Sequence, residues 1–326
     1  MALPKILLTR TLPPESQKLI ENAQDIELLH WKEDRSIPRD QLLKLIPGVS
    51  GFLCLLTEKI DSELLDIAGP NLKVVSTFSV GYDHVDLNEI RKRKIPLGYT
   101  PDVLTDATAE MTALLVIAAA RRMRESIHTV EDGKWSKWGP LWMLGTQLTN
   151  KTVGIVGLGR IGAATAHRLK PFLGSNGKII YSGNSDKPVA IELGATRVKF
   201  DMLIREADVI CICCSLNKQT SEMFNYDVFK VMKKNVILVN TARGAIIQQD
   251  DLVRALSEGL LGSVGLDVTT PEPLQPDHPL LKFPNVTVVP HLGSATLETR
   301  TMMGNLAVEN VLSGVRGQPL PRAVEL

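Results

Sequence analysis

Three polar residues in the C-terminal half of the sequence each follow a short apolar run. Arg243 stands in LVNTARGAI, Glu272 lies between two prolines in GLDVTTPEPL, and His291 follows the run VTVVP. An imidazolium can deliver a proton to a carbonyl oxygen that gains negative charge, and a carboxylate bonded to its other nitrogen would favour that charged form. The planar fork of an arginine can hold a neighbouring carboxylate. These residue types therefore suit the reduction of a carbonyl beside a carboxylate.

Taken singly, each of these residues has a more common structural explanation. An arginine at a strand end is usually a surface cation, a glutamate in a proline loop is usually solvated, and a lone histidine is usually structural. All three, however, follow the carboxyl ends of predicted strands, the edge of an open α/β sheet where ligands bind. The shared edge predicts one site with Arg243, Glu272 and His291 as its catalytic residues. Pro290 ends the strand before His291, and Gly293 is expected to leave room for a cofactor ring.

A glycine-rich turn lies upstream of these residues. VGIVGLGRIG places glycines in the pattern G-x-G-x-x-G, directly after a predicted strand and at the start of a predicted helix. Glycines at these positions permit a tight turn, backbone contact with a pyrophosphate and close helix packing, and the helix start provides amide groups. We therefore predict a dinucleotide site with contacts from Gly157, Gly159, Arg160, Ile161 and Gly162.

The choice of dinucleotide depends on the next strand, which ends in YSGNSDK. An NAD site usually has an acidic residue at this strand end for the ribose 2′-hydroxyl, and none stands there. The sequence therefore favours NADP(H), with NAD(H) still possible because Asp186 could fold back toward the ribose. Predicted cofactor ligands in this segment are Ser182, Asn184, Ser185 and Lys187, and other strand ends add Ser215, Thr241, Asp267 and Gly293.

Substrate contacts are predicted in both halves of the chain. In STFSVGYDHVD, Val80 and Gly81 occupy a turn whose backbone amides could bind a carboxylate. The site would then lie in a cleft between two domains, with the cofactor on one wall. The predicted substrate-binding residues are Val80, Gly81, Trp138, Arg243, Asp267, His291 and Ser294.

Short apolar strands alternate with helical patterns along the chain, which is typical of parallel sheets covered by helices on both faces. We predict two doubly wound parallel-sheet α/β domains: a flavodoxin-like substrate domain of residues 1–104 and 296–326, and a Rossmann cofactor domain of residues 105–295. The predicted strands of the first are Ile6–Thr9, Glu27–Leu29, Phe52–Leu55, Val74–Thr77 and Pro96–Tyr99. Those of the second are Thr152–Val156, Lys178–Ser182, Val198–Phe200, Val209–Cys213, Val236–Asn240, Ser263–Asp267 and Val286–Val289. Helices are predicted over Asp106–Met123 and Ala295–Ser313.

Charge and composition argue against several classes of partner. Lys and Arg number 37 against 36 acidic residues, a balance that disfavours nucleic acid or a membrane surface. The N-terminal MALPKILLTR lacks the apolar core and cleavage site of a signal peptide, and the longest apolar stretch is about half of a bilayer span. We therefore expect a cytoplasmic protein. The cysteines, expected to be reduced thiols without a metal because strand side chains alternate in direction, are Cys54, Cys211, Cys213 and Cys214.

The motifs STFSVGYDHVD, YTPDVLTDATAE, VGIVGLGRIG, VNTARGAI, GLDVTTPEPL and PHLGSAT jointly resemble the D-2-hydroxyacid dehydrogenases over nearly the full chain. Within that family, GYTPDVLTD, GLDVTTPEPL and GKWSKWGPLWMLG are similar to the glyoxylate and hydroxypyruvate reductases. The resemblance implies NAD(P)H-dependent reduction of glyoxylate to glycolate and of hydroxypyruvate to D-glycerate. It also implies substrate binding by Arg243, proton donation by His291 beside Glu272, and a homodimer formed through the cofactor domains. NADP-preferring relatives often carry arginine near the position of Asn184.

Other functions stay open at this point. A phosphoglycerate dehydrogenase would share Arg243, Glu272 and His291, but it usually has the ribose-binding acid and often a regulatory extension. A nucleotide-sensing protein similar to the corepressors built on this fold would bind the cofactor and turn it over very slowly. A formate dehydrogenase of this fold lacks the glutamate beside its histidine, so Glu272 argues against it.

The stretch GKWSKWGPLWMLG, residues 133–145, keeps neither a helix nor a strand period and is predicted to be a loop. Aromatic residues clustered on a loop often mark an interface. We predict that this loop reaches across the dimer and that Trp138 approaches the partner's substrate site, limiting substrate size. Trp135 and Trp142 are expected to support association. The alternative is that the tryptophans cap the core of their own domain.

Overall fold

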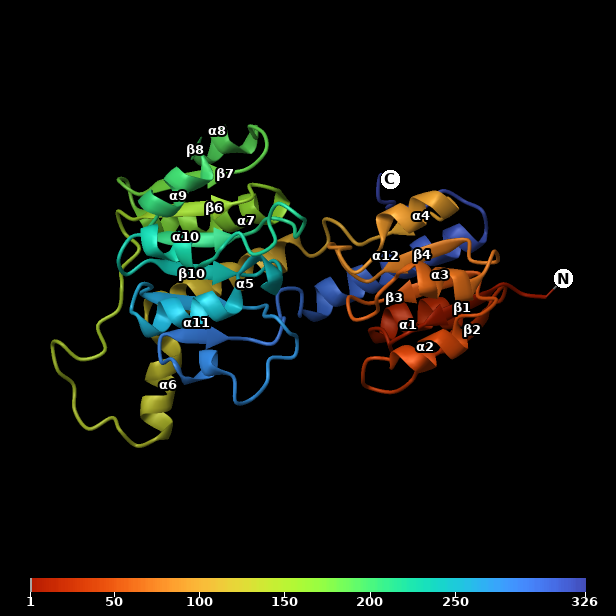
Figure 1. Ribbon diagram of the computed structural model, residues 1–326, viewed down its shortest axis with the longest axis horizontal. Helices are drawn as coiled ribbons and strands as arrows, with labels where there is room; N and C mark the ends of the chain where they lie inside the picture. The colour runs from red at the N-terminus through yellow and green to blue at the C-terminus, as the bar shows by residue number, and fades with distance from the viewer. Residues whose placement is uncertain (1) are drawn as a thin grey trace. The chain divides into compact units, whose positions relative to one another are not determined.

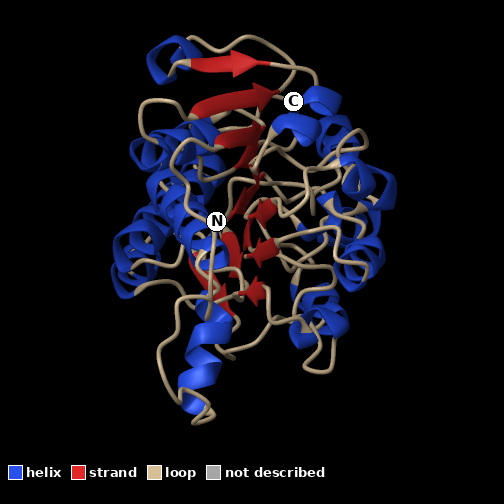
Figure 2. Ribbon diagram, turned by 90° about the vertical axis from the view of Figure 1, so that its left-hand side faces the viewer, coloured by secondary structure: helices blue, strands red, loops and turns tan. Residues whose placement is uncertain are grey.

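The computed structural model describes residues 2–326 and divides them into two compact units, both visible in Figure 1. The first unit contains the residues up to Leu104 together with Ala295–Leu326, and the second contains Thr105–Ser294. In both units parallel strands alternate with helices, and Figure 2 shows strands lying between helices. Within residues 2–326, no helix combines the length and the apolar character needed to cross a membrane.

The first unit has a five-stranded parallel sheet in the order β2-β1-β3-β4-β5, the flavodoxin-like order. Its strands are β1 (Lys5–Leu8), β2 (Glu27–His30), β3 (Gly51–Cys54), β4 (Val74–Thr77) and β5 (Leu97–Gly98). Its helices are α1 (Pro14–Glu21), α2 (Arg39–Leu45), α3 (Ser62–Ala68), α4 (Leu87–Arg93) and α12 (Leu297–Val315). The last helix packs closely on the sheet, since a Cβ added at Gly314 would come within 2.4 Å of the Cβ of Val74.

The second unit has a seven-stranded parallel sheet in the order β12-β11-β10-β9-β6-β7-β8, which is a Rossmann order extended by β12. Its strands are β6 (Thr152–Val156), β7 (Lys178–Ser182), β8 (Ala195–Arg197), β9 (Val209–Ile212), β10 (Ile237–Asn240), β11 (Ser263–Leu266) and β12 (Val286–Val288). Its α-helices are α5 (Thr105–Ala120), α6 (Met123–Glu131), α7 (Arg160–Leu169), α8 (Val189–Leu193), α9 (Phe200–Glu206), α10 (Tyr226–Val231) and α11 (Gln249–Ser257).

Alternating side chains on the central strands of the second unit supply two cores, one on each face of the sheet. Ile210 and Leu238 belong to one core, and Val209 and Val239 belong to the other. Both faces are apolar because helices cover both, as expected for a parallel sheet. The polar residues of this unit are therefore concentrated at the ends of the strands.

All four cysteines are free thiols. Cys54 and Cys211 are buried, whereas Cys213 and Cys214 are half-buried just after β9. Burial raises the pKa of Cys213 to about 12 and that of Cys214 to about 11. These two thiols therefore stay protonated at neutral pH and are poor nucleophiles.

The predicted helix Asp106–Met123 is wrong in its last turn because the chain breaks at Arg122. Helix α5 ends at Ala120, and α6 begins at Met123. Arg122 has φ 52°, in the left-handed region that interrupts a helix, and its guanidinium donates two 2.8 Å hydrogen bonds to Glu125. Good helix formers lie on both sides of the break, so helix propensity alone does not reveal it.

The strand predicted at Val198–Phe200 is wrong, because β8 covers Ala195–Arg197 instead. Phe200 begins α9, and its ring packs edge-on against Phe224 with the centroids 5.4 Å apart. Strand β8 pairs with β7 so that Arg197 lies opposite Tyr181. This register puts a charged side chain at the end of the edge strand. The other strands differ from prediction only at their ends, and the last helix begins at Leu297 because Thr296 caps it.

Candidate functional site

One edge of the seven-stranded sheet gathers most of the predicted site residues. All of the strands are parallel, so residues that follow their carboxyl ends lie on the same side. The predicted residues at this edge are Gly157 after β6, Ser182 ending β7, Ser215 after β9, Thr241 and Arg243 after β10, Asp267 after β11, and His291, Gly293 and Ser294 after β12.

His291 occupies a strained backbone position at this edge. Its φ is 55°, in the left-handed region that residues other than glycine rarely adopt. Its amide N–H donates to the carbonyl oxygen of Asp267 over 2.9 Å, and its ring Nδ1 lies 2.8 Å from Oε2 of Glu272. The side chains of His291 and Glu272 are 30% and 39% exposed. No side chain in residues 2–326 bonds to Nε2, so that nitrogen is available to a ligand.

Glu272 is held by the loop that follows β11. Its Oε1 accepts a 3.0 Å hydrogen bond from the amide of Thr269, while Oε2 is bonded to His291. Burial acts to raise the pKa of Glu272, but the hydrogen bond and charge of His291, the Thr269 amide and the Arg243 guanidinium together hold that pKa below its usual value. Glu272 is therefore an anion beside the imidazole at neutral pH, as a partner for an imidazolium must be.

Asp267 clamps the loop that carries His291. It is buried, and its carboxylate accepts hydrogen bonds from the amides of Leu292 at 2.5 Å and Gly293 at 2.8 Å. Burial raises the pKa of Asp267, and these bonds together with the charge of His291 oppose that rise only in part. A Cβ added at Gly293 would lie 2.9 Å from Oδ2 of Asp267 and 3.3 Å from the Thr108 methyl group. A side chain at position 293 would therefore press against Asp267 and Thr108.

Arg243 follows β10 in a turn that a buried asparagine shapes. The side chain of Asn240 donates to the carbonyl oxygen of Arg243 at 2.8 Å and accepts from the amide of Ala242 at 3.0 Å. The Arg243 guanidinium lowers the pKa of Glu272, so its charge acts on the His291–Glu272 pair. Thr241, before it, is buried and bonded through its hydroxyl to that of Thr112 at 2.7 Å. The turn thus brings a cation to the acid–base pair.

The glycine turn between β6 and α7 fits a dinucleotide. Gly157 has φ 94°, and an added Cβ there would lie 2.7 Å from Cα of Cys214. A Cβ at Gly162 would come within 2.2 Å of the Gly157 carbonyl oxygen, so glycine is needed for the close approach of helix and strand. Beside Gly159, by contrast, there is open space. The amides of Arg160 and Ile161 begin α7 there, so these residues would form a cradle for a pyrophosphate.

The segment after β7 would receive the ribose of that dinucleotide. The amide of Gly157 donates to the carbonyl oxygen of Ser182 at 2.9 Å, which joins the segment to the glycine turn. Ser182 is buried, whereas Asn184 and Ser185 are exposed. The amide of Lys187 donates to the hydroxyl of Tyr181 at 3.2 Å and closes the loop. The predicted ligands therefore line one short loop.

Two polar residues at this edge were not predicted from the sequence. The side-chain amide of Gln249 clamps the backbone of Thr270, accepting from its N–H at 3.0 Å and donating to its carbonyl oxygen at 2.5 Å. This fixes the loop that holds Glu272. Arg197, from β8, donates to the carbonyl oxygen of Gly183. Only the position of Arg197 at the end of an edge strand could have revealed it, and that strand was misplaced.

Val80 and Gly81 lie in the first unit, directly after β4. The hydroxyl of Ser79 donates to the carbonyl oxygen of Gly81 at 2.6 Å, and the carbonyl oxygen of Ser79 accepts from the amide of Thr100 at 2.8 Å. Within residues 2–326, the amide N–H groups of Val80 and Gly81 have no hydrogen-bond acceptor. This half-buried turn therefore presents two donors, as the binding of a carboxylate requires.

The tryptophan-rich segment is a loop, as predicted, and extends from the second unit as an arm in Figure 1. We call residues 132–151, between α6 and β6, the arm. Trp135, Trp138 and Trp142 are 62%, 80% and 41% exposed, so the alternative that they cap the core of their own domain is wrong. Preceding the arm, α6 exposes the apolar side chains of Met123, Ile127 and Val130. The arm and α6 thus both expose large apolar side chains.

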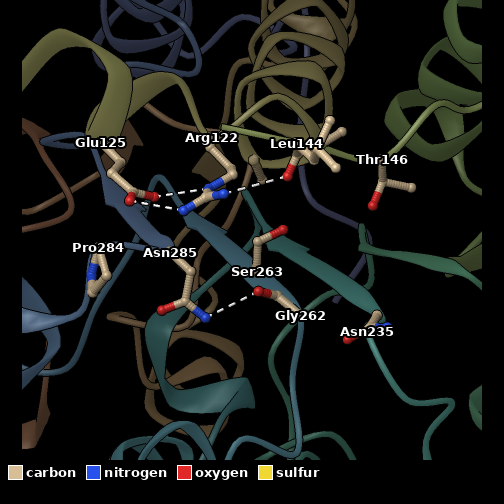
Figure 3. A pocket seen from close by; sticks show the side chains of 12 residues that line it. Arg122, Glu125, Leu144, Thr146, Asn235, Gly262, Ser263, Pro284 and Asn285 are labelled. Atoms are coloured by element: carbon tan, nitrogen blue, oxygen red, sulfur yellow. Dashed lines mark hydrogen bonds and ion pairs between the residues drawn. The ribbon is translucent and has the colours of Figure 1, made fainter. Parts of the chain in front are cut away.

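The base of the arm lies at the opposite edge of the sheet, beside a pocket of about 410 Å³ that Arg122 helps to line (Figure 3). Arg122 binds Glu125 of α6 and donates to the carbonyl oxygen of Leu144 in the arm. It therefore links the arm to the helix that precedes it. Arg124 donates to three backbone carbonyl groups, including those of Leu281 at 2.6 Å and Val286 at 2.7 Å. The arm is therefore anchored at its root and exposed beyond it.

Comparison with known proteins gives consistent results. The NAD-binding domain model of the D-isomer specific 2-hydroxyacid dehydrogenases matches residues 113–293. A human protein named glyoxylate reductase/hydroxypyruvate reductase is 46% identical over 323 residues, covering 99% of this chain and 98% of the human one. A solved Thermus thermophilus protein has a TM-score of 0.90 at 39% identity, covering 98% of this chain and all of that one. An NADPH-dependent glyoxylate/hydroxypyruvate reductase of Sinorhizobium meliloti, solved with NADP and malonate, has a TM-score of 0.84 at 29% identity, covering 99% and 97%.

Proposed function

The chain belongs to the family of D-isomer specific 2-hydroxyacid dehydrogenases, and from that premise we propose that it reduces small 2-keto acids with NADPH. The substrates are glyoxylate, reduced to glycolate, and hydroxypyruvate, reduced to D-glycerate. The observation that carries the proposal is the 2.8 Å contact between His291 and Glu272, at the edge that also holds Arg243 and the glycine turn. The names of the relatives favour these two substrates over phosphoglycerate.

The roles of the residues follow from their chemistry. A bound dihydronicotinamide supplies the hydride for the substrate carbonyl carbon. His291 donates a proton from Nε2 to the carbonyl oxygen, while Glu272 stabilises the imidazolium through Nδ1. Arg243 holds the substrate carboxylate and polarises the neighbouring carbonyl with its planar fork. Asp267 keeps the loop of His291 in place through two amides. For the first unit, we propose that the amides of Val80 and Gly81 are carboxylate-binding donors.

The preference for NADPH is supported by the end of β7. The sole carboxylate in residues 182–187 belongs to Asp186, and it is 3.3 Å from the Arg197 guanidinium. A negatively charged 2′-phosphate would therefore meet donors and cations in this loop. The Sinorhizobium meliloti relative was solved with NADP, which supports the same preference. NADH stays the alternative cofactor.

Initial-rate assays with NADPH and NADH test the proposal directly. We expect glyoxylate and hydroxypyruvate to be reduced with higher kcat/KM than pyruvate, and NADPH to be used in preference to NADH. A protein that binds NADPH but turns it over negligibly with all three acids would be a nucleotide sensor instead. A preference for NADH would contradict the cofactor assignment and leave the reductase assignment intact.

Glu272→Gln is expected to keep partial activity and to move the alkaline limit of reduction to lower pH. The neutral amide still bonds the ring but no longer favours the imidazolium, so the proton donor is lost at lower pH. The measurement is kcat/KM for glyoxylate against pH in both proteins. A pH profile that coincides with the wild-type one would remove Glu272 from the acid–base pair.

The same substitution should also change how the stability of the fold depends on pH. Because the folded protein lowers the pKa of Glu272, its ionised carboxylate stabilises the fold above the ordinary glutamate pKa. That contribution is lost as pH falls through the lowered pKa. Denaturant titration at several pH values should therefore show that acidification lowers the free energy of unfolding less for Glu272→Gln than for wild type.

The arm leads to a second prediction, on assembly and substrate size. We infer that the protein is a homodimer in which the arm contacts the partner, because Trp138 is 80% exposed on an anchored apolar segment. Trp138→Ala should raise kcat/KM for bulkier 2-keto acids relative to glyoxylate, whereas Trp135→Ala and Trp142→Ala should weaken association. Substrate profiling and sedimentation of each variant measure both effects. A monomeric wild type, or an unaltered substrate ranking in Trp138→Ala, would contradict the inference.

A further inference from the structure

An arginine from the edge strand of the second unit reaches the loop that follows the neighbouring strand. Arg197 is the last residue of β8 and lies opposite Tyr181 of β7 in the parallel register. Its side chain crosses to that loop, where Nη2 and Nε donate to the carbonyl oxygen of Gly183 at 2.9 and 3.3 Å. The guanidinium therefore lies beside the carboxyl end of β7, although it comes from a different strand.

This loop is joined to the glycine turn. The amide of Gly157 donates to the carbonyl oxygen of Ser182 over 2.9 Å. This hydrogen bond holds the end of β7 next to the phosphate cradle. In a glycine turn of this kind the adenosine ribose lies at the end of the second strand. A Cβ added at Gly183 would meet no atom within 4 Å, so there is open space over the loop. A ribose substituent placed there would meet the Arg197 guanidinium.

The charge of Arg197 is balanced by an exposed partner. Nη1 lies 3.3 Å from Oδ1 of Asp186, whose side chain is 85% exposed, while that of Arg197 is 38% exposed. An ion pair with so exposed a carboxylate is weak, because water competes for both groups. A phosphate dianion can accept two parallel hydrogen bonds from the guanidinium fork, and it would displace the aspartate readily.

We propose that Arg197 recognises the 2′-phosphate of NADPH and that Asp186 is its counterion when no nucleotide is bound. The proposal rests on the proposed function for the identity of the nucleotide. Asn184 and Ser185, both exposed on the same loop, supply neutral donors beside the cation. The chain thus places its cation on β8 and needs no arginine directly after β7. In the opposite assignment Asp186 accepts from the ribose hydroxyls of NADH, and Arg197 merely orients that carboxylate.

The first test measures nucleotide binding without catalysis. Isothermal titration calorimetry with adenosine 2′,5′-bisphosphate and with 5′-AMP compares ligands that differ in the 2′-phosphate alone. Arg197→Gln should weaken binding of the bisphosphate about 10- to 100-fold, the loss expected for charge-assisted hydrogen bonds, and should change 5′-AMP binding less than about threefold. Asp186→Asn should tighten binding of the bisphosphate. Arg254→Gln, which removes an exposed arginine paired with Glu258 on α11, is the matched control for net charge.

Three outcomes would overturn the proposal: unchanged bisphosphate affinity in Arg197→Gln, equal losses for both ligands, or an equal loss in the Arg254→Gln control. Kinetics then separate this proposal from the proposed function. Arg197→Gln should lower kcat/KM for NADPH and leave that for NADH nearly unchanged, whereas Asp186→Asn should not impair NADH. A large loss of NADH activity in Asp186→Asn would favour the opposite assignment. If the protein reduces no keto acid but binds the bisphosphate through Arg197, the proposed function fails and the binding site stands.

Discussion

Replacing His291 by asparagine is expected to lower kcat for glyoxylate reduction by about 10²- to 10⁴-fold, the range that general acid catalysis contributes. Asparagine can still donate a hydrogen bond to Glu272, but it cannot carry the proton that the substrate oxygen needs. The glycine turn binds the nucleotide independently, so the Kd of NADPH should stay within about threefold of wild type. Steady-state kinetics and fluorescence titration with NADPH measure the two effects.

The matched control for this variant is His128→Asn. His128 also pairs with a glutamate, Glu131, with Nδ1 and Oε2 3.3 Å apart, but on the exposed surface of α6. Its replacement should leave kcat unchanged. Turnover by His291→Asn near the wild-type rate would exclude His291 as the proton donor. Loss of NADPH binding in the same variant would instead indicate that His291 supports the cofactor site.

Arg243→Gln is expected to lower kcat/KM for glyoxylate by about 10²- to 10³-fold, because an oriented charge at a developing oxyanion and a bidentate carboxylate contact are both lost. Arg243→Lys keeps the charge but not the planar fork, and it should recover only a small part of the loss. Both variants should raise KM for the keto acid more than KM for NADPH. Initial rates with each substrate varied in turn measure this difference.

Folding of the Arg243 variants can be checked independently. The turn is held by the side chain of Asn240 acting on backbone groups, so neither substitution removes its support. Thermal unfolding of both variants should therefore stay close to that of wild type. If Arg243→Lys were as active as wild type, a point charge would suffice and the bidentate role would be wrong.

The fold and the main site residues were predictable because both depend on local patterns. Apolar runs alternate with helical periods, and the polar residues that follow those runs must meet at one edge of a parallel sheet. Arg243, Glu272 and His291 lie at that edge, and the last two are in hydrogen-bond contact. The glycine turn could be placed because its spacing has a steric cause that the Gly157–Gly162 contact illustrates.

What could not be predicted depends on contacts between segments distant in sequence. The left-handed Arg122 interrupts a stretch of good helix formers, and its guanidinium binds the carbonyl oxygen of Leu144, which is 22 residues away. The Asp267 side chain turns back to bind the amide of Gly293, which lies 26 residues further along the chain. Arg197 was missed because Phe200, which leaves the sheet to pack on Phe224, displaces the predicted strand. None of these contacts can be read from a helix or strand periodicity in the sequence.

The most direct test of the central claim is the stoichiometry and stereochemistry of hydroxypyruvate reduction by the wild-type protein. NADPH oxidation is followed by absorbance, and the glycerate formed is quantified by chiral chromatography. We predict one D-glycerate for each NADPH oxidised, with the same outcome at lower efficiency for NADH. Formation of L-glycerate, or NADPH binding without glycerate, would contradict the assignment of this chain as a D-specific 2-keto acid reductase.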